Sequence, residues 1–465
     1  MGLLKEEIEN LIEEANKGNF EAQTNLGDCY FYGDGVSKNY EEAVKMYTLA
    51  ANQNYAPALK KLGNCYYNGD GVKQDFPEAF KKWTQAADQN YVPAFNNIGY
   101  YYDYYEDERN YTEAIKWYKL AAEQNYAFSQ NHLGDCYFYG KGVDKNYSEA
   151  VKWYKLAATQ GNDKAELKLG FCYNHGFGVN KDYNEGVKWY KLAADQGNIS
   201  AQYNLGVCYT KGQGVNKDYN EAVKWYKLAA TQGYASAQAN LGDCYYYGNG
   251  VDKDYSEAVK WYKLAAEQEN LKAKFLLGFC YFNGYGVSID YKEAVRLYKE
   301  AIKEGYEYAY NNLGQCYKYG KGVEQDYAEA YKCFDYLANQ DDALGQYELA
   351  WFYYNGYVVK KDYNEVFRLL KLSAEQDYEA AECFLGDCYY FGYGVDKNYN
   401  EAVKWYKLAA EQEYPEAQCN LGICYKYGYG IDKDEKEADK WLELANSQGF
   451  DYAKSRLTGC NQNQE

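Results

Sequence analysis

A Leu-Gly dipeptide returns along this chain every 36 residues. Ile98-Gly99 and Leu349-Ala350 occupy the two places in the series where Leu-Gly is missing, and only the step from Gly99 to Gly134 is shorter, at 35 residues. A fixed period of this length is typical of a solenoid, whose units bury their apolar faces against their neighbours. The copies are Leu26-Gly27, Leu62-Gly63, Leu133-Gly134, Leu169-Gly170, Leu205-Gly206, Leu241-Gly242, Leu277-Gly278, Leu313-Gly314, Leu385-Gly386 and Leu421-Gly422.

Each unit contains two segments with helical periodicity, which we call helix A and helix B. In the unit around Leu205-Gly206, apolar residues recur at i, i+4, i+7 and i+8 in both segments. Gly212 and Gly214 separate the segments, and Asp218 followed by Glu221 predicts a capping box at the start of helix B. The short loops predict that the two helices are antiparallel neighbours. The periodic residues are Ala201, Leu205, Cys208 and Tyr209 in helix A, and Ala222, Tyr226, Ala229 and Ala230 in helix B.

Gly206 stands inside helix A, where glycine costs about 1 kcal/mol relative to alanine. Its return in nearly every unit predicts a helix crossing too close for a Cβ atom. We expect the small residues of helix B, such as Ala222 and Ala229, to form the other wall. Ala350, which replaces this glycine once, should then push its neighbours slightly apart.

These patterns predict an all-α fold, a right-handed α/α superhelical solenoid of about twelve 36-residue helix-turn-helix repeats. Residues 1–18 are expected to form an N-terminal capping helix that aligns with helix B. Residues 19–459 form the repeat array with a partial C-terminal capping helix, and 460–465 a frayed tail. No linker interrupts the array, so we expect one cooperative domain.

The full unit, from Ala201 through Leu205-Gly206, Gly212-Gln213-Gly214 and Trp225-Tyr226 to Gly233, resembles the Sel1-like repeat. The unit is also similar to the tetratricopeptide signature, but its period is two residues longer. The resemblance implies a tetratricopeptide-like α/α solenoid that acts as an adaptor or scaffold. Relatives include components of membrane-protein quality control and bacterial proteins that engage host cells. Two units depart from the pattern, because Asp103 to Arg109 lack the paired glycines and Val358 replaces the second glycine.

The formal net charge is -18 and the pI is about 4.8. An acidic surface repels nucleic acids and attracts basic proteins or peptides. No apolar run has the length of a membrane span, and the N-terminus has no signal-peptide pattern. The sequence therefore predicts a cytoplasmic protein without direct membrane insertion. Export by a non-standard route stays open, and the oligomeric state is not set.

Ten of the fourteen cysteines occupy one position of the repeat. Equivalent positions in stacked helices lie roughly 8–10 Å apart, whereas a disulfide needs Cα atoms closer than about 7 Å. We therefore expect buried free thiols that pack as small apolar groups. The ten are Cys29, Cys65, Cys136, Cys172, Cys208, Cys244, Cys280, Cys316, Cys388 and Cys424.

The sequence contains no recognisable catalytic set, metal-ligand cluster or cofactor motif. The only histidines, His132 and His175, lie in different units and are expected at the surface or in a groove. Gly212-Gln213-Gly214 closes a helix instead of opening one, so we interpret it as a turn and not as a phosphate-binding loop. We therefore predict that the protein is not an enzyme and uses no cofactor. The alternative to a binding scaffold is an enzyme, a hydrolase of the kind suggested for cysteine-rich relatives.

Two rows of helix A vary between copies of the unit, so packing does not dictate them. They follow Leu-Gly directly and four residues later, and therefore share one face of the helix. By analogy with tetratricopeptide helices, this stripe should line the concave groove and bind Lys- or Arg-bearing partner proteins or peptides. Alternatively, some of these rings pack between adjacent A helices, and the chain is an architectural spacer or a host-interaction effector. The predicted partner-binding residues are Asp28, Tyr32, Asp135, Tyr139, Phe171, His175, Asp243, Tyr247, Phe279, Tyr319, Asp387 and Phe391.

Overall fold

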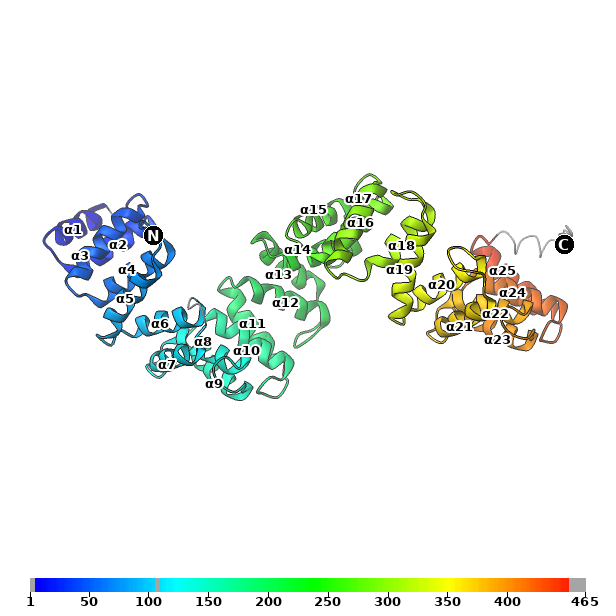
Figure 1. Cartoon of the computed structure of the whole chain (residues 1–465), viewed down its shortest axis with the longest axis horizontal. Coiled ribbons are helices and arrows are strands. Elements are labelled where there is room, and N and C mark those ends of the chain that lie inside the picture. The colour runs from blue at the N-terminus through cyan, green and yellow to red at the C-terminus, as the bar shows by residue number, and fades with distance from the viewer. Residues whose placement is uncertain (1–4, 105–108, 451–465) are drawn as a thin grey trace. The chain divides into compact units, whose positions relative to one another are not determined.

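The computed structural model describes residues 5–104 and 109–450 (Figure 1). These residues form 25 α-helices and no strand. The chain divides into two compact units, Met1–Ala237 and Gln238–Glu465. Within each unit the helices stack in chain order as antiparallel pairs, which confirms the predicted α/α solenoid of twelve repeats. The predicted partial capping helix near the C-terminus lies outside the described residues.

The even-numbered helices are the A helices. Their bounds are α2 Phe20–Tyr32, α4 Ala56–Asn68, α6 Val92–Tyr104, α8 Ala127–Tyr139, α10 Asp163–His175, α12 Ile199–Lys211, α14 Ala235–Tyr247, α16 Leu271–Asn283, α18 Ala309–Tyr319, α20 Ala343–Asn355, α22 Glu379–Phe391 and α24 Pro415–Tyr427.

The odd-numbered helices from α3 onward are the B helices. Their bounds are α3 Tyr40–Asn52, α5 Phe76–Ala87, α7 Tyr111–Ala122, α9 Tyr147–Ala158, α11 Tyr183–Asp195, α13 Tyr219–Thr231, α15 Tyr255–Ala266, α17 Tyr291–Lys303, α19 Tyr327–Asn339, α21 Tyr363–Ala374, α23 Tyr399–Glu411 and α25 Glu435–Ser447. An additional helix, α1 (Lys5–Asn16), precedes the first pair and buries Ile8 and Ala15 against α2.

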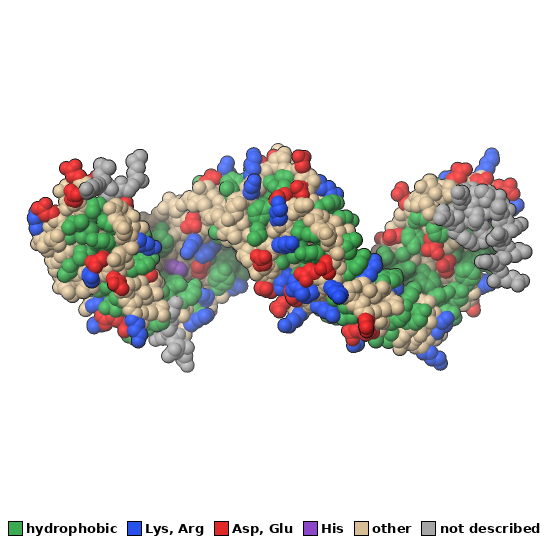
Figure 2. Space-filling view, turned by 90° about the horizontal axis from the view of Figure 1, so that it is seen from above, with side chains coloured by type: hydrophobic (Ala, Val, Ile, Leu, Met, Phe, Trp, Pro, Cys, Tyr) green, Lys and Arg blue, Asp and Glu red, His purple; other side chains and the backbone are tan. Residues whose placement is uncertain are grey.

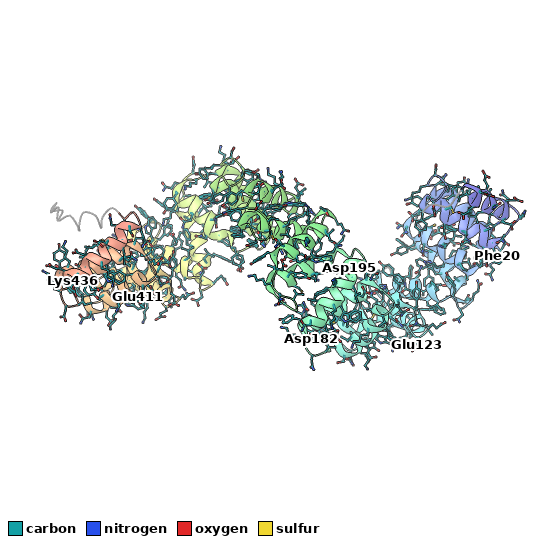
Figure 3. All side chains as sticks on the ribbon, turned by 180° about the vertical axis from the view of Figure 1, so that it is seen from behind. Phe20, Glu123, Asp182, Asp195, Glu411 and Lys436 are labelled. Atoms are coloured by element: carbon teal, nitrogen blue, oxygen red, sulfur yellow. The ribbon has the colours of Figure 1, made fainter. Side chains whose placement is uncertain are left out.

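An Asp or Asn side chain caps the N-terminus of each B helix. Asp218 accepts hydrogen bonds from the backbone N–H groups of Asn220 and Glu221 at the start of α13. Asp182 does the same for α11, and Figure 3 labels it at the opposite end of that helix from Asp195. The reciprocal half of the predicted capping box is wrong, because the Glu221 carboxylate pairs with Lys224 one turn along the helix.

The paired glycines that follow ten of the twelve A helices form the predicted turn. Gly212 ends α12 in the left-handed conformation (φ +69°), and Gly214 (φ +73°) follows. A Cβ atom on Gly214 would lie 2.1 Å from the carbonyl oxygen of Tyr183, at the start of the preceding B helix. The second glycine therefore permits both a left-handed turn and close contact between successive repeats.

Val358 stands at the place of this second glycine in the tenth repeat and has a φ of +67°. The left-handed conformation costs an L-residue roughly 1–2 kcal/mol, and a β-branched side chain is disfavoured further. We expect Val358→Gly to raise the free energy of unfolding by about 1 kcal/mol in urea titration. Val359→Gly, at a neighbouring position without a positive φ, should lower it. A loss of stability in Val358→Gly would contradict this account.

The atoms nearest to a Cβ atom placed on Gly206 belong to an aromatic ring and not to the alanines that the sequence suggested. A Cβ atom there would lie 2.6 Å from the ring of Tyr226, which is 2% exposed. The displacement of neighbouring helices that Ala350 was expected to cause stays a prediction. The residue of α21 equivalent to Tyr226 is Leu370, which shares a buried cluster with Ala350. The tenth repeat therefore pairs an alanine of helix A with a leucine of helix B, whereas the other repeats pair a glycine with an aromatic ring or, in the twelfth, with Leu442.

The ten repeat cysteines are buried and free, as predicted. Burial raises the pKa of their thiols, to about 12 for Cys172 and about 11 for Cys316. The thiol is therefore the stable form near neutral pH, and these residues pack as small apolar groups.

Candidate binding surface on the A helices

Aromatic side chains project into solvent from the last residue of several A helices. The five most exposed of them are Tyr32 and Tyr139 in the first unit, and Tyr247, Tyr319 and Phe391 in the second. Their exposed fractions range from 52% for Phe391 to 71% for Tyr32. Figure 2 shows hydrophobic side chains reaching the surface among acidic and basic ones. Such exposure leaves these rings available to a partner, because a core role would have buried them.

Phe171 and Phe279 lie less openly. The Phe171 ring is 6.3 Å from Phe138 of the preceding A helix and 5.8 Å from Phe177 of its own loop. Phe279 is half-buried, with its ring centroid 6.1 Å from that of Tyr285. At these two positions the rings contribute to packing within and between repeats, as the alternative interpretation expected for part of the stripe.

Three of the four predicted aspartates are paired within the chain. Each accepts a hydrogen bond from the tyrosine hydroxyl of its B helix and forms an ion pair with a lysine of the next A helix. Their negative charge is therefore largely compensated before any partner arrives. The pairs are Asp28 with Tyr47 (2.7 Å) and Lys61 (2.8 Å), Asp135 with Tyr154 (2.7 Å) and Lys168 (2.6 Å), and Asp243 with Tyr262 (2.8 Å) and Lys272 (2.5 Å).

Asp387 is different. It accepts hydrogen bonds from the Tyr406 hydroxyl (2.6 Å) and the Asn420 amide (3.3 Å), and no lysine or arginine among the described residues pairs with it. Burial, with a smaller contribution from the nearby carboxylate of Glu416, raises the pKa of Asp387 to about 6, although the hydrogen bond from Tyr406 opposes this shift. This repeat therefore retains an uncompensated acidic site.

Because the pKa of Asp387 is raised in the folded state, the free energy of unfolding should depend on pH. An unfolded Asp has a pKa of about 3.9, so the folded state binds the proton more tightly between pH 4 and 6. Folded stability from this group is thus present at low pH and lost as pH rises through that window. Asp387→Asn should be more stable than wild type by about 2 kcal/mol at pH 7 and equal to it at pH 4. Urea unfolding at both pH values checks this, and a variant less stable at pH 7 would contradict it.

The lysines that compensate the aspartates were not among the residues predicted from the sequence. Lys168 follows its aspartate by 33 residues, whereas Lys272 follows its own by 29. The two positions are one helical turn apart on the next A helix, so both reach the same carboxylate. Comparing residues at these two spacings after each aspartate would have revealed the pairing.

The two histidines have separate roles. His132 is half-buried, its ring stacks on that of Tyr118 with centroids 5.0 Å apart, and burial lowers its pKa to about 4. His175 is exposed, stacks on Phe177 and contacts the Phe171 carbonyl oxygen through Nδ1 at 2.9 Å. Across residues 5–104 and 109–450, no three His, Cys, Asp or Glu side chains gather in a metal-binding arrangement.

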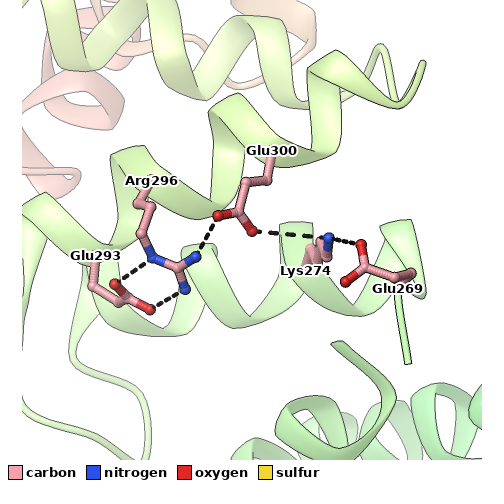
Figure 4. A network of polar contacts seen from close by, with 5 residues as sticks. All are labelled: Glu269, Lys274, Glu293, Arg296 and Glu300. Carbon is pink, nitrogen blue, oxygen red and sulfur yellow. Dashed lines mark hydrogen bonds and ion pairs between the residues drawn. The ribbon is translucent and has the colours of Figure 1, made fainter. Parts of the chain in front are cut away.

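Other charged groups of the second unit compensate one another. Figure 4 shows Arg296 bridging Glu293 and Glu300 on α17, while the buried Lys274 of α16 contacts Glu300 and Glu269. This network lines a cleft of about 310 Å³. Because its acids and bases pair locally, it does not resemble the site at Asp387.

No helix in the described part of the chain is long and apolar enough to span a membrane.

Comparisons with known proteins agree with the repeat geometry. The model of the Sel1 repeat matches twelve consecutive segments between residues 20 and 450. A protective antigen of uropathogenic Escherichia coli with an SLR fold is 30% identical, over 97% of this chain and 91% of that chain, with a TM-score of 0.68. A Sel1 repeat protein from Oxalobacter formigenes is 28% identical over 66% of this chain and 90% of its own, with a TM-score of 0.49. No curated protein matches the chain.

Proposed function

The chain belongs to the Sel1 repeat family, and from this premise we propose that it is a scaffold that binds partner proteins or peptides on its A helices. Solenoids present extended surfaces on which successive repeats contact one partner. The observation that carries the proposal is the recurrence of exposed aromatic residues at the ends of A helices, from Tyr32 to Phe391.

Two physical features favour a polypeptide partner with basic residues. Tyrosine is enriched among the residues that contribute most to protein interfaces, because its ring supplies contact area and its hydroxyl a hydrogen bond. Each of these rings also stands at a helix C-terminus, where the partial negative charge of the helix favours cations. The net charge of -18 attracts basic partners in addition.

The aspartates are poor sites for testing this proposal. A lysine at Asp135 or Asp243 would face Lys168 or Lys272 and would remove an internal ion pair, so a loss of binding could reflect a damaged fold. The exposed tyrosines are better suited, because their removal disturbs little packing.

We expect Tyr32→Ala, Tyr247→Ala and Tyr319→Ala, combined in one chain, to reduce capture of partner proteins from native extract at least tenfold. Three similarly exposed leucines of the B helices, Leu49, Leu264 and Leu408, provide the matched control. Their triple alanine variant should capture partners like wild type, and both variants should keep the wild-type melting temperature within a few degrees. Equal capture by the two variants would remove the A-helix surface from the proposal.

A further inference from the structure

A cleft of about 370 Å³ opens between α22, α23 and α24, and we call it the Asp387 cleft. Its lining includes the carboxyl groups of Asp387 and Glu416, the Asn420 amide, and the rings of Phe391 and Tyr406. Asp387 lies at its inner side, half-buried, whereas Glu416 is exposed at the rim. The cleft thus combines negative charge with aromatic walls.

The same cleft occurs seven repeats earlier in the first unit, where its contents differ. There it measures about 270 Å³ and is lined by Tyr139, Tyr154 and Lys168, at positions equivalent to Phe391, Tyr406 and Asn420. The Lys168 ammonium lies 2.6 Å from Asp135 and 5.6 Å from the centre of the Tyr154 ring. In this repeat the chain's own lysine thus satisfies the aspartate and stacks on the ring.

In other repeats, too, a lysine ammonium lies beside the residue equivalent to Asp135. Lys61 and Lys272 pair with Asp28 and Asp243 from the next A helix. In the tenth repeat Trp351 takes the place of the aspartate, and the Lys318 ammonium lies 3.8 Å from the centre of that ring. Three repeats therefore pair this aspartate with a lysine ammonium from the next A helix, whereas in the tenth repeat the ammonium comes from the preceding A helix and lies over an aromatic ring.

In the eleventh repeat, neither position that supplies a lysine elsewhere is basic. The residue 33 positions after Asp387 is Asn420, and the residue 29 positions after it is Glu416. The second replacement is a reversal of charge relative to Lys272. The eleventh repeat thus keeps the aspartate and the aromatic ring but lacks the lysine. At one of the two lysine positions it carries a second carboxyl group instead.

We propose that the Asp387 cleft accepts one lysine side chain of a partner polypeptide, an inference that rests on the scaffold function proposed above. The ammonium would donate hydrogen bonds to the carboxylates of Asp387 and Glu416 and face the Tyr406 ring. The methylene chain would lie along Phe391. Charge-assisted hydrogen bonds and a cation–π contact are the interactions that Lys168 makes in the equivalent cleft.

The test uses the full chain and a blocked pentapeptide, acetyl-Gly-Gly-Lys-Gly-Gly-amide, with saturation-transfer NMR to measure weak affinity. We expect saturable binding that is lost, at least tenfold in Kd, when the lysine is Nε-acetylated or replaced by norleucine. We expect the same loss in Asp387→Asn/Glu416→Gln. The charge-matched control is Glu401→Gln/Glu411→Gln, which removes two carboxylates from α23; Figure 3 labels Glu411. Equal binding of the acetylated peptide, or unchanged binding of the lysine peptide to Asp387→Asn/Glu416→Gln, would overturn the proposal. A second peptide carries arginine in place of lysine, and tighter binding of that peptide would overturn the choice of lysine.

A gain-of-site variant keeps the proposal testable if the loss variant folds poorly. Lys164→Glu/Lys168→Asn gives the equivalent cleft the residues of the eleventh repeat and removes both lysines that can reach Asp135, so a second peptide should bind and raise the stoichiometry from one to two. A stoichiometry that stays at one would count against the proposal. The tyrosine triple variant lacks no residue of the Asp387 cleft, so its results separate the two ideas. Peptide binding without tyrosine-dependent capture would contradict the scaffold surface, whereas capture without lysine-peptide binding would contradict only the cleft.

Discussion

Gly206→Val should lower the free energy of unfolding by about 3 kcal/mol, because the new side chain meets the buried ring of Tyr226. A Cβ atom at 2.6 Å cannot be accommodated unless the ring or the helix moves, and the ring is enclosed on all sides. Val207→Ala, at the adjacent half-buried position, should cost less than about 1 kcal/mol. Urea unfolding followed by circular dichroism measures both, and equal effects would contradict the close packing.

The tenth repeat suggests how the same cost could be removed. Gly206→Ala combined with Tyr226→Leu copies the pair formed by Ala350 and Leu370. We expect the double variant to be destabilised less than the sum of the two single variants, since alanine and leucine already pack together at these positions in the tenth repeat. The shape of the transition also tests the predicted cooperativity of the array. One shifted transition would agree with a single domain, whereas a shift in only part of the signal would indicate that the two units unfold separately.

The second large effect is expected at a buried ion pair. Lys318 and Glu348 are 5% and 6% exposed, and their charged atoms lie 2.7 Å apart. Lys318→Met should cost about 3 kcal/mol, because it leaves Glu348 charged and buried without its partner. Lys318→Met combined with Glu348→Leu should recover most of that loss. A single variant that costs less than about 1 kcal/mol would show that the pair does not hold α18 to α20 as its geometry indicates.

The repeat architecture could be predicted because each of its signals is local and recurs in at least ten of the twelve repeats. The spacing of Leu-Gly, the glycine turn and the Asp or Asn before each B helix each depend on a few neighbouring residues, as Gly212 and Asp218 illustrate. The wall opposite Gly206 could not be derived in the same way. Both Tyr226 and Ala222 lie on the buried face of helix B, and periodicity alone does not say which of them crosses the glycine.

The candidate surface was predictable in its aromatic part and not in its charge. The variable row of helix A identified Tyr32, Tyr247 and Tyr319 as residues that packing does not require, and their exposure agrees with that reasoning. The charge of the aspartates depends on contacts with the next repeat. The lysines that pair with Asp135 and Asp243 come from two positions one turn apart, so no single spacing describes them. For the same reason, the distinct character of Asp387 emerges only when the next A helix is in place.

Photo-crosslinking from matched positions of one repeat tests the scaffold proposal most directly. Benzoyl-phenylalanine would replace Tyr247 at the end of α14 in one variant and Leu264 of α15 in another, since both side chains are exposed. We predict that a partner captured from native extract crosslinks to position 247 and not to position 264, and that 0.5 M salt weakens the product. Crosslinking from position 264 alone, or equally from both, would contradict the account that the A helices form the binding surface.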